Sequence, residues 1–484
     1  MKKTLSWLLS CVCALLCVSV FSACKKEQKV GSRYEIIAEY VPENGTVAGT
    51  AKVAFENTTE SEISVLKFQL YPNAYRKDAK RLPVPYSYEN TAYYAGESYG
   101  EMVISSVAGA KNWEVMGEDE NILYAHLEQS LFPGDRVVLD IGFLVKLALI
   151  NHRTGITQNT VNLGNFFPVL CGIKNGGFYE AEYHAVGDPF YQDCADFSLA
   201  LTVPKEYVVA ATGTVAKERT LEQKKEYVFL AESVRDFAVV ASNQFKILQR
   251  EVGGNTLFYY YYADETAEEK LALAAEAFAY FEETLGEYPY QNYSLVQTGF
   301  CYGGMEYPCL SMLSDSLSKE QAVRAIVHET AHQWWGVVVG SDQIENAWQD
   351  EGLAEYSAIA FFENYQKYGV TRESAVNEAL KEYRSYYDVY GSVLGRSDTK
   401  MTRTLGEFIS EYEYICLEYD KSIVMLDTLR KSVGDDKFFA GLRRYYKDNA
   451  FAIAIPEDLI GSFERVGLDV YGFFDSFLSG KAIL

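Results

Sequence analysis

Two patterns of hydrophobic positions divide the chain near residue 250. Before that point, short runs rich in Val, Ile, Phe, Tyr and Thr alternate with turn clusters such as Asn44-Gly45 and Pro133-Gly134. Runs of this kind predict β-strands, and examples are Thr46–Phe55, Ser64–Tyr71, Arg136–Phe143, Phe197–Val203, Tyr207–Thr212 and Phe237–Ala241. We therefore expect residues 33–248 to form an all-β N-terminal domain of sandwich type.

After residue 250 the spacing of apolar positions becomes mainly helical. A strand at Thr256–Tyr262, an alanine-rich helix at Ala267–Leu285 and a strand at Ser294–Thr298 precede a glycine loop. Helical spacing then predicts helices at about 319–336, 350–368, 372–388, 421–433, 436–447 and 456–466. The fold class expected is multidomain, with the β domain followed by a mostly helical α+β domain over residues 249–484.

The composition narrows the class of protein. Hydrophobic residues make up 48% of the 484 positions, which is ample for a packed core and argues against disorder. The formal net charge of −23 repels phosphate backbones, so nucleic acid is not expected as a partner. The same charge disfavours docking on anionic lipid, so attachment to a membrane needs a separate device.

The N-terminus has the features of an export signal that could provide this attachment. Two lysines begin the chain, the apolar run Leu5–Ala23 follows, and Cys24 stands directly after small residues. This resembles a bacterial lipoprotein signal, in which the cysteine is acylated, although Phe21 stands where an aliphatic residue is usual. We expect residues 1–23 to be a signal peptide, residues 24–32 a linker, and the protein to be exported and anchored to the bacterial cell membrane or envelope through lipidated Cys24. An uncleaved signal anchor and plain cleavage are the alternatives.

Five cysteines lie beyond the signal, and their number and wide spacing are not those of a disulfide framework. We expect free, mostly buried thiols and leave open a Cys171–Cys194 bridge. The five are Cys171, Cys194, Cys301, Cys309 and Cys416.

The strongest chemical signal is His328-Glu329-Thr330-Ala331-His332, which contains two of the chain's five histidines. The predicted helix has a start signal, because Ser318 and Gln321 fit a capping box. Positions four apart share one helix face, so both imidazoles can bind one tetrahedral zinc ion. Glu329 can reach a water on that ion but cannot comfortably bind the ion itself, which makes it the candidate general base.

A catalytic zinc site needs a third protein ligand and an open position. Glu351 opens the next predicted helix, nineteen residues after His332, and we expect it to be that ligand. Glu355 lies one turn further and is the candidate partner that orients His328.

With these residues the chain resembles the gluzincin aminopeptidase family. The resemblance covers roughly residues 33–484 and is strong from 300 to 430. The zinc signature matches at His328, Glu329, His332 and Glu351, and the motif Glu418-Tyr419-Asp420-Lys421 matches the family's conserved tyrosine region. The family's Gly-x-Met-Glu-Asn motif is present as Gly303-Gly304-Met305-Glu306-Tyr307, with Tyr307 in place of Asn.

The resemblance implies a thermolysin-like catalytic domain with one zinc ion per chain and peptides as substrates. It implies that Tyr419 stabilises the oxyanion and that Glu306 binds the substrate's free amine, with Gly303, Gly304 and Met305 beside it. The expected activity is therefore that of a zinc aminopeptidase.

The family usually adds a C-terminal helical domain over the active site. The chain ends 65 residues after Tyr419, so we expect that domain to be missing and the site to be more open. Two other functions remain: a zinc endopeptidase of the same fold, and a non-catalytic surface binding lipoprotein. The sequence indicates neither the oligomeric state nor the preferred side chain.

Overall fold

Residues 31–484 are described by the computed structural model, and they form one compact unit. The predicted signal peptide, Cys24 and most of the predicted linker lie outside the described residues. Within 31–484, no helix combines the length and the apolar composition that a membrane span requires.

The first half of the chain is built of β-strands. Its largest sheet has seven strands in the order β15-β16-β13-β1-β2-β7-β4. Their bounds are β1 Ser32–Val41, β2 Thr46–Glu56, β4 Glu101–Ala108, β7 Arg136–Lys146, β13 Ala195–Pro204, β15 Thr214–Leu221 and β16 Lys224–Val234. Strand β1 pairs antiparallel with β2 and parallel with β13. Its side chains alternate between buried and exposed, as expected where one face of a sheet covers a core.

Smaller sheets pack against this one around a shared apolar core. Two have four strands, in the orders β10-β3-β6-β5 and β14-β17-β9-β8, and a third is the β11-β12 pair. Their bounds are β3 Ile63–Gln69, β5 Ala110–Met116, β6 Ile122–Leu131, β8 Thr154–Ile156, β9 Val161–Gly164, β10 Val169–Leu170, β11 Ile173–Lys174, β12 Gly177–Phe178, β14 Val208–Ala211 and β17 Ala238–Ser242. Short helical segments in this half are η1 Tyr71–Tyr75, η2 Tyr86–Tyr88 and α2 Glu89–Ala92.

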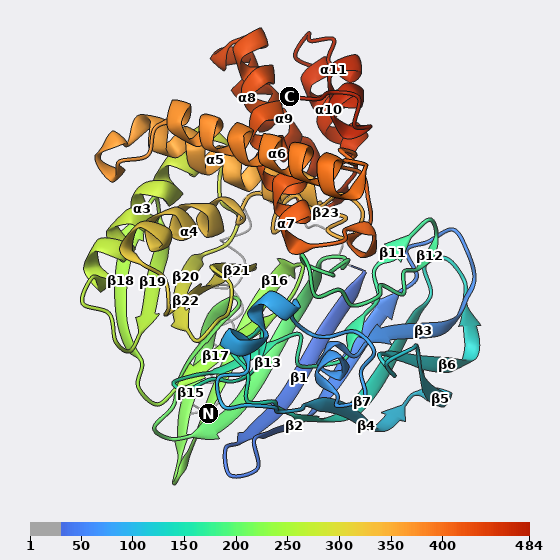
Figure 1. The fold of residues 1–484 in the computed structure, drawn as a ribbon. Helices are drawn as coiled ribbons and strands as arrows, with labels where there is room; N and C mark the ends of the chain where they lie inside the picture. Colours follow the sequence, from blue (N-terminus) through green and yellow to red (C-terminus); the bar gives the residue numbers. More distant parts are fainter. Residues whose placement is uncertain (1–30) are drawn as a thin grey trace, which may run out of the picture. The chain divides into compact units, whose positions relative to one another are not determined.

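The second half combines a five-stranded sheet with helices. The strand order is β18-β19-β20-β22-β21, and the bounds are β18 Lys246–Val252, β19 Asn255–Tyr261, β20 Asn292–Thr298, β21 Gly304–Tyr307 and β22 Leu310–Ser314. Helix α3 (Ala267–Thr284) packs on β18 and β19, and α4 (Lys319–Ala331) packs on β21 and β22 (Figure 1). The predicted domain boundary between residues 248 and 249 falls inside β18.

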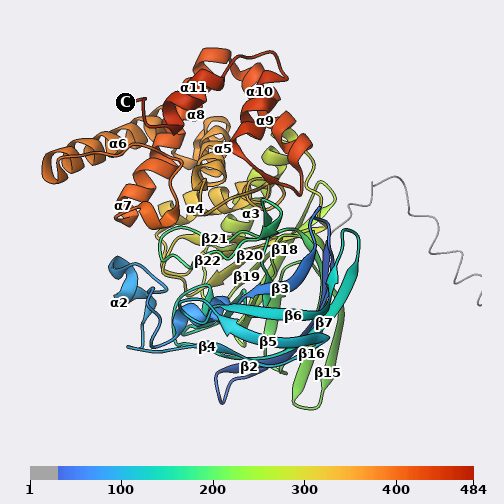
Figure 2. The same cartoon turned by 90° about the vertical axis from the view of Figure 1, so that its right-hand side faces the viewer.

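Helix α5 (Glu351–Asn364) is apolar around most of its circumference and is therefore almost completely buried. The remaining helices are α6 Arg372–Leu394, α7 Glu411–Tyr414, α8 Lys421–Val433, α9 Asp435–Asn449, α10 Pro456–Glu464 and α11 Tyr471–Leu478. Short segments are β23 Gly340–Ser341, β24 Ile453–Ala454, η3 Ala347–Gln349, η4 Gln366–Tyr368, η5 Leu405–Glu407 and the π-helix η6 Ile415–Asp420. In both views, α4 and α5 lie between strands β1–β7 and helices α8–α11 (Figures 1 and 2).

The predicted fold class is confirmed, and several local expectations differ from the structure. The helix expected over 350–368 is α5 followed by the separate segment η4, and the helix expected over 372–388 continues to Leu394. The helix expected over 319–336 ends at Ala331: residues 332–334 form a turn, and Gly336, at φ +90°, lies in a second turn between the bridge partners Trp335 and Val339. Helix α11 was not predicted, and it is the last helix of the chain. The five cysteines from Cys171 to Cys416 are free and buried, as expected.

Candidate functional site

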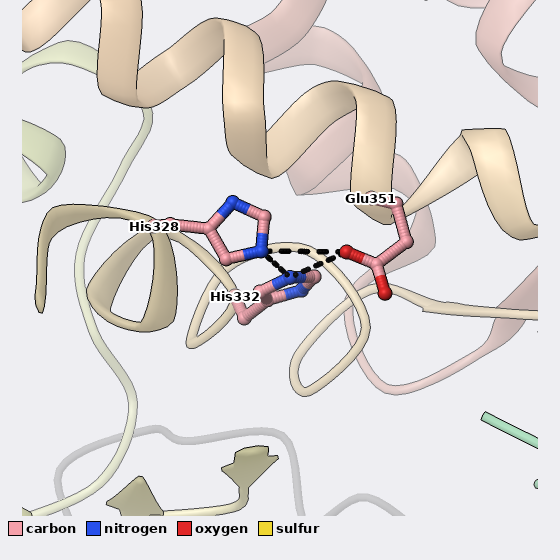
Figure 3. A group of neighbouring side chains, drawn as sticks. All are labelled: His328, His332 and Glu351. Carbon is pink, nitrogen blue, oxygen red and sulfur yellow. Dashed lines mark hydrogen bonds and ion pairs between the residues drawn. The ribbon is translucent and has the colours of Figure 1, made fainter. Parts of the chain in front are cut away.

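Two histidines and a glutamate converge where α4 ends and α5 begins. Ser318 and Gln321 form the predicted capping box, which starts α4 in the register that points both histidines into the site. The Nε2 atoms of His328 and His332 lie 2.9 Å apart, and Glu351 Oε2 lies 3.3 and 3.2 Å from them. Figure 3 shows the three side chains pointing toward one another from the two helices.

The donor set fits a zinc ion. Two imidazoles and one carboxylate form a known three-ligand zinc set, and donors held about 2.0–2.1 Å from a tetrahedral ion lie about 3.3 Å apart. The observed separations of 2.9–3.3 Å agree with that spacing. The three residues also form one of the potential metal-binding groups among the described residues.

The outward-facing nitrogen of each imidazole has a partner that fixes the ring. Glu355 Oε2 lies 2.8 Å from His328 Nδ1, as predicted for a residue one turn beyond Glu351. The backbone carbonyl of Trp335 lies 3.1 Å from His332 Nδ1, which the turn after α4 makes possible. Partners of this kind select the tautomer that leaves Nε2 available to a metal ion. Burial disfavours the charged form of His328, but Glu351 and Glu355 outweigh it and raise its pKa.

Glu329 lies beside this group without joining it. Its side chain is buried, and Oε2 has no hydrogen-bond partner among the described residues. Burial raises the pKa of Glu329 to about 7, while the neighbouring histidines act in the opposite direction. The carboxylate fits closely against β21, because a Cβ built on Gly304 would come within 2.3 Å of Oε1.

Glu306 is held at the end of β21. The Gln343 amide donates to Glu306 Oε1 at 3.3 Å and to Asp350 Oδ2 at 2.8 Å. Glu306 and His332 belong to a second group whose ligand atoms all lie within 4.8 Å of one another. Burial, followed by the charge of Asp188, raises the pKa of Glu306 well above its usual value.

Asp188 is a site residue that the sequence did not reveal. Its carboxylate lies within 4.8 Å of those of Glu306 and Glu351, although it comes from a loop of the β-rich half. A buried ion pair with Arg153 holds it, and Arg153 Nε also contacts Met305 Sδ at 3.1 Å. Met305 therefore supports Arg153, and it does not line the cavity as its neighbours Gly304 and Glu306 do. No local pattern marks Asp188, because its role depends on a distant loop reaching β21.

Tyr419 enters the site from the π-helix η6. A π-helical turn has an extra residue relative to an α-helix, and such turns concentrate at functional sites. The Tyr419 ring stacks on His328 with 6.1 Å between centroids, and it contacts the Tyr414 ring at 5.8 Å. Burial, and then the charge of Glu351, raises the pKa of Tyr419 well above its usual value.

Tyr307, the departure from the family motif, anchors β21 to the β-rich half. Its hydroxyl donates to Asn165 Oδ1 at 3.0 Å, and the Asn165 amide donates to Asp236 Oδ2 at 2.5 Å. The absence of a side chain at Gly164 makes room, because a Cβ there would lie 2.0 Å from the Tyr307 oxygen.

A cavity of about 330 Å³ unites these residues. Eight of the ten residues predicted from the sequence within 31–484 line it: Gly303, Gly304, Glu306, His328, Glu329, Glu351, Glu355 and Tyr419. Met305 and His332 do not line it, and His332 joins the site through its contacts with His328 and Glu351. Asp188, Arg153 and Tyr414 line it as well. The volume suits an extended segment of a few residues rather than a folded chain.

The comparisons with known proteins agree with this geometry. Residues 269–477, which contain His328, His332 and Glu351, match the Peptidase family M1 domain. Aminopeptidase 2 of Candida albicans is 21% identical over 408 residues, covering 73% of this chain and 42% of that protein. Leukotriene A-4 hydrolase of Xenopus laevis is 26% identical over 185 residues, covering 37% of this chain and 30% of that protein. The chain thus spans less than half the length of these curated relatives.

A solved structure matches the whole fold. The M1 zinc metallopeptidase from Deinococcus radiodurans superposes with a TM-score of 0.67 at 16% identity, over 96% of this chain and 97% of that chain. The order of a β-rich half followed by an α+β half is therefore that of a known protein.

Proposed function

We propose that the protein is a zinc-dependent aminopeptidase that removes N-terminal residues from peptides. The observation that carries this proposal is the placement of two further carboxylates, Glu306 and Asp188, beside the His328–His332–Glu351 group. A hydrolytic metal site needs an open position and a base, whereas an exopeptidase also needs a counter-charge for the terminal amine. The described residues offer all three in one cavity.

His328, His332 and Glu351 would hold the zinc ion. When bound there, zinc lowers the pKa of a water from 15.7 to about 7 and polarises the scissile carbonyl.

Glu329 moves the proton. Its buried Oε2 has no partner among the described residues and is therefore available to accept a proton from the attacking water. The same oxygen then passes the proton to the nitrogen of the leaving amine.

Tyr419 acts on the carbonyl oxygen. Its hydroxyl donates a hydrogen bond to the oxygen as negative charge develops there. A positioned donor of this type contributes about 3–4 kcal/mol to the stability of a transition state.

Glu306 and Asp188 bind the substrate's α-ammonium group, whose pKa of about 7.7–8.0 leaves it largely cationic at neutral pH. Burial raises the pKa of both carboxyl groups; repulsion by the charge of Asp188 adds to this effect at Glu306, and repulsion by the charge of Glu351 adds to it at Asp188. A cation between them offsets that repulsion, so a free amine gains binding energy that a blocked one does not. Because the pair lies next to His332, cleavage follows the first residue.

The test compares a peptide with its N-acetylated twin. We expect the wild type to prefer the free peptide strongly, and Glu306→Ala to lose roughly 30- to 1000-fold in kcat/KM on it. Glu268→Ala is the matched control, because Glu268 is an exposed glutamate on α3. Equal cleavage of both peptides by the wild type would favour the endopeptidase and leave the zinc site standing.

We further propose that the protein is exported and held at the membrane through lipidated Cys24. The support is the sequence pattern alone, an uncharged apolar run that ends in small residues before that cysteine. Cys24→Ser is expected to abolish labelling by a fatty-acid analogue. A wild type that takes up no label would favour the signal anchor or plain secretion.

A further inference from the structure

Arg324 is the exposed positive charge in an acidic cavity. The carboxylates that line the cavity are those of Asp188, Glu306, Glu329, Glu351, Glu355 and Glu411. Two guanidinium groups line it as well, and Arg153 is buried in its ion pair with Asp188. Among the described lining residues, Arg324 alone offers a cation that reaches solvent, with 49% of its side chain exposed.

Strand β21 and helix α4 lie along the cavity, and their residues define its two ends. At one end, Glu306 of β21 meets His332 near the end of α4, with their ligand atoms within 4.8 Å. In the middle, Gly304 faces Glu329, because a Cβ built on Gly304 would overlap the carboxylate, 2.3 Å from its Oε1. Strand β21 and helix α4 therefore run in the same direction along the cavity.

The other end of the cavity belongs to Arg324. A Cβ built on Gly303 would lie 4.0 Å from that of Ala325, which is the residue after Arg324. Arg324 precedes His328 by four residues, so the two share a helix face about 6 Å apart along the axis. The amine-binding end and the guanidinium thus lie on opposite sides of the metal ligands.

A short peptide spans this distance. Each extended residue covers about 3.3–3.6 Å, so a substrate whose amine lies at Glu306 carries its second and third residues past the metal ligands toward Arg324. The guanidinium there offers a planar pair of donors that matches a carboxylate.

We propose that Arg324 binds a carboxylate on the leaving portion of the substrate. In a di- or tripeptide this is the C-terminal carboxylate, and in a longer peptide it is an acidic side chain at the second or third position. The proposal rests on the aminopeptidase function, and it names the substrate class as short or acidic peptides.

The ion pair that Arg324 already forms with Glu378 does not prevent it from binding a substrate carboxylate. Its guanidinium lies 3.3 Å from Glu378 of α6, and both side chains are exposed, at 49% and 61%. Exposed ion pairs of this kind contribute little to stability. A substrate carboxylate that also gains contacts within the cavity can therefore replace Glu378.

The experiment measures kcat/KM for four substrates: alanyl-4-nitroanilide, Ala-Ala-Ala, its C-terminal amide, and Ala-Asp-Ala amide. We expect the wild type to prefer the tripeptide acid over its amide by about 10-fold, mainly through KM, as one partly exposed charge-assisted hydrogen bond allows. Arg324→Gln should abolish this ratio and Arg324→Lys should retain part of it. Lys319→Gln, which removes an exposed cation from the same helix, should leave the ratio unchanged.

The outcomes separate the two proposals. Equal turnover of acid and amide by the wild type, or a preference that survives in Arg324→Gln, overturns the role of Arg324. Arg324-dependent preference for Ala-Asp-Ala amide over Ala-Ala-Ala amide identifies a side-chain carboxylate as a ligand, whereas its absence assigns the site to the C-terminus. If zinc-loaded wild type hydrolyses neither the nitroanilide nor any peptide, the aminopeptidase function itself fails, and the role of Arg324 fails with it.

Discussion

Replacing Gly304 with alanine is expected to displace the general base without unfolding the protein. The added Cβ would lie 2.3 Å from Glu329 Oε1, and 2.5 and 2.7 Å from Cδ and Cγ. An ordinary contact begins at 3.4 Å, so the carboxylate must move by about 1 Å. A misplacement of that size costs about 100-fold in rate when the group takes part in the chemistry.

The assay is steady-state hydrolysis of an aminoacyl nitroanilide, with zinc content measured on the same sample. Because Glu329 does not bind the metal, Gly304→Ala should retain zinc and lose about 100-fold in kcat. Gly472→Ala is the control, since a Cβ at that helical position meets nothing within 4 Å.

Near-normal kcat in Gly304→Ala would contradict the reasoning, because it would mean that the Glu329 position is not critical. Loss of zinc would also contradict it, because the displacement would then have reached the ligands.

Four further outcomes are expected. Glu329→Gln should keep zinc and lose at least about 100-fold in turnover; hydrolysis near the wild-type rate would remove Glu329 from the mechanism. Tyr419→Phe should lower kcat by about 100-fold or more with little change in KM, and a change in KM alone would make Tyr419 a binding residue. Glu355→Gln should weaken zinc affinity by about 10- to 100-fold in a chelator competition, and unchanged affinity would show that Glu355 does not support its histidine. Burial raises the pKa of Asp236 from 3.8 to about 7, so the folded state holds this proton more tightly than the unfolded chain. The protonated Asp236 therefore adds to the free energy of unfolding below about pH 4, and this contribution, on the order of 4 kcal/mol, is lost as the pH rises to about 7. Urea unfolding should show this loss in the wild type and not in Asp236→Asn.

The zinc helix was predictable because its signals are local. The capping box at Ser318 sets the start of α4, and a four-residue spacing sets the relation of His328 to His332. Glu351 was predictable for a similar reason, since it opens the next helix and a three-ligand site needs a carboxylate or histidine nearby. The positions of many strands and helices also follow from the periodicity of apolar residues, whereas the end of α4 and the presence of α11 did not.

The rest of the site depends on contacts between distant segments. Asp188 reaches Glu306 only because the β-rich half packs on β21, and no periodic pattern encodes that approach. Likewise, the sequence shows Tyr307 as a departure from a motif but not the hydrogen bond to Asn165 that explains it. The π-helical turn that carries Tyr419 was also missed, because apolar spacing does not distinguish one extra residue from a frayed helix.

The shared core has a consequence for how the protein unfolds. Met305, Tyr307 and Met312, from the catalytic sheet, belong to the same apolar cluster as the strands of the β-rich half. Separating residues 31–248 from residues 249–484 would expose these side chains and remove the partner of Tyr307, so the core that the two halves share would be opened on both sides. We therefore expect the two halves to melt in one cooperative transition, which makes the β-rich half an obligatory part of the folding unit that contains the catalytic strand.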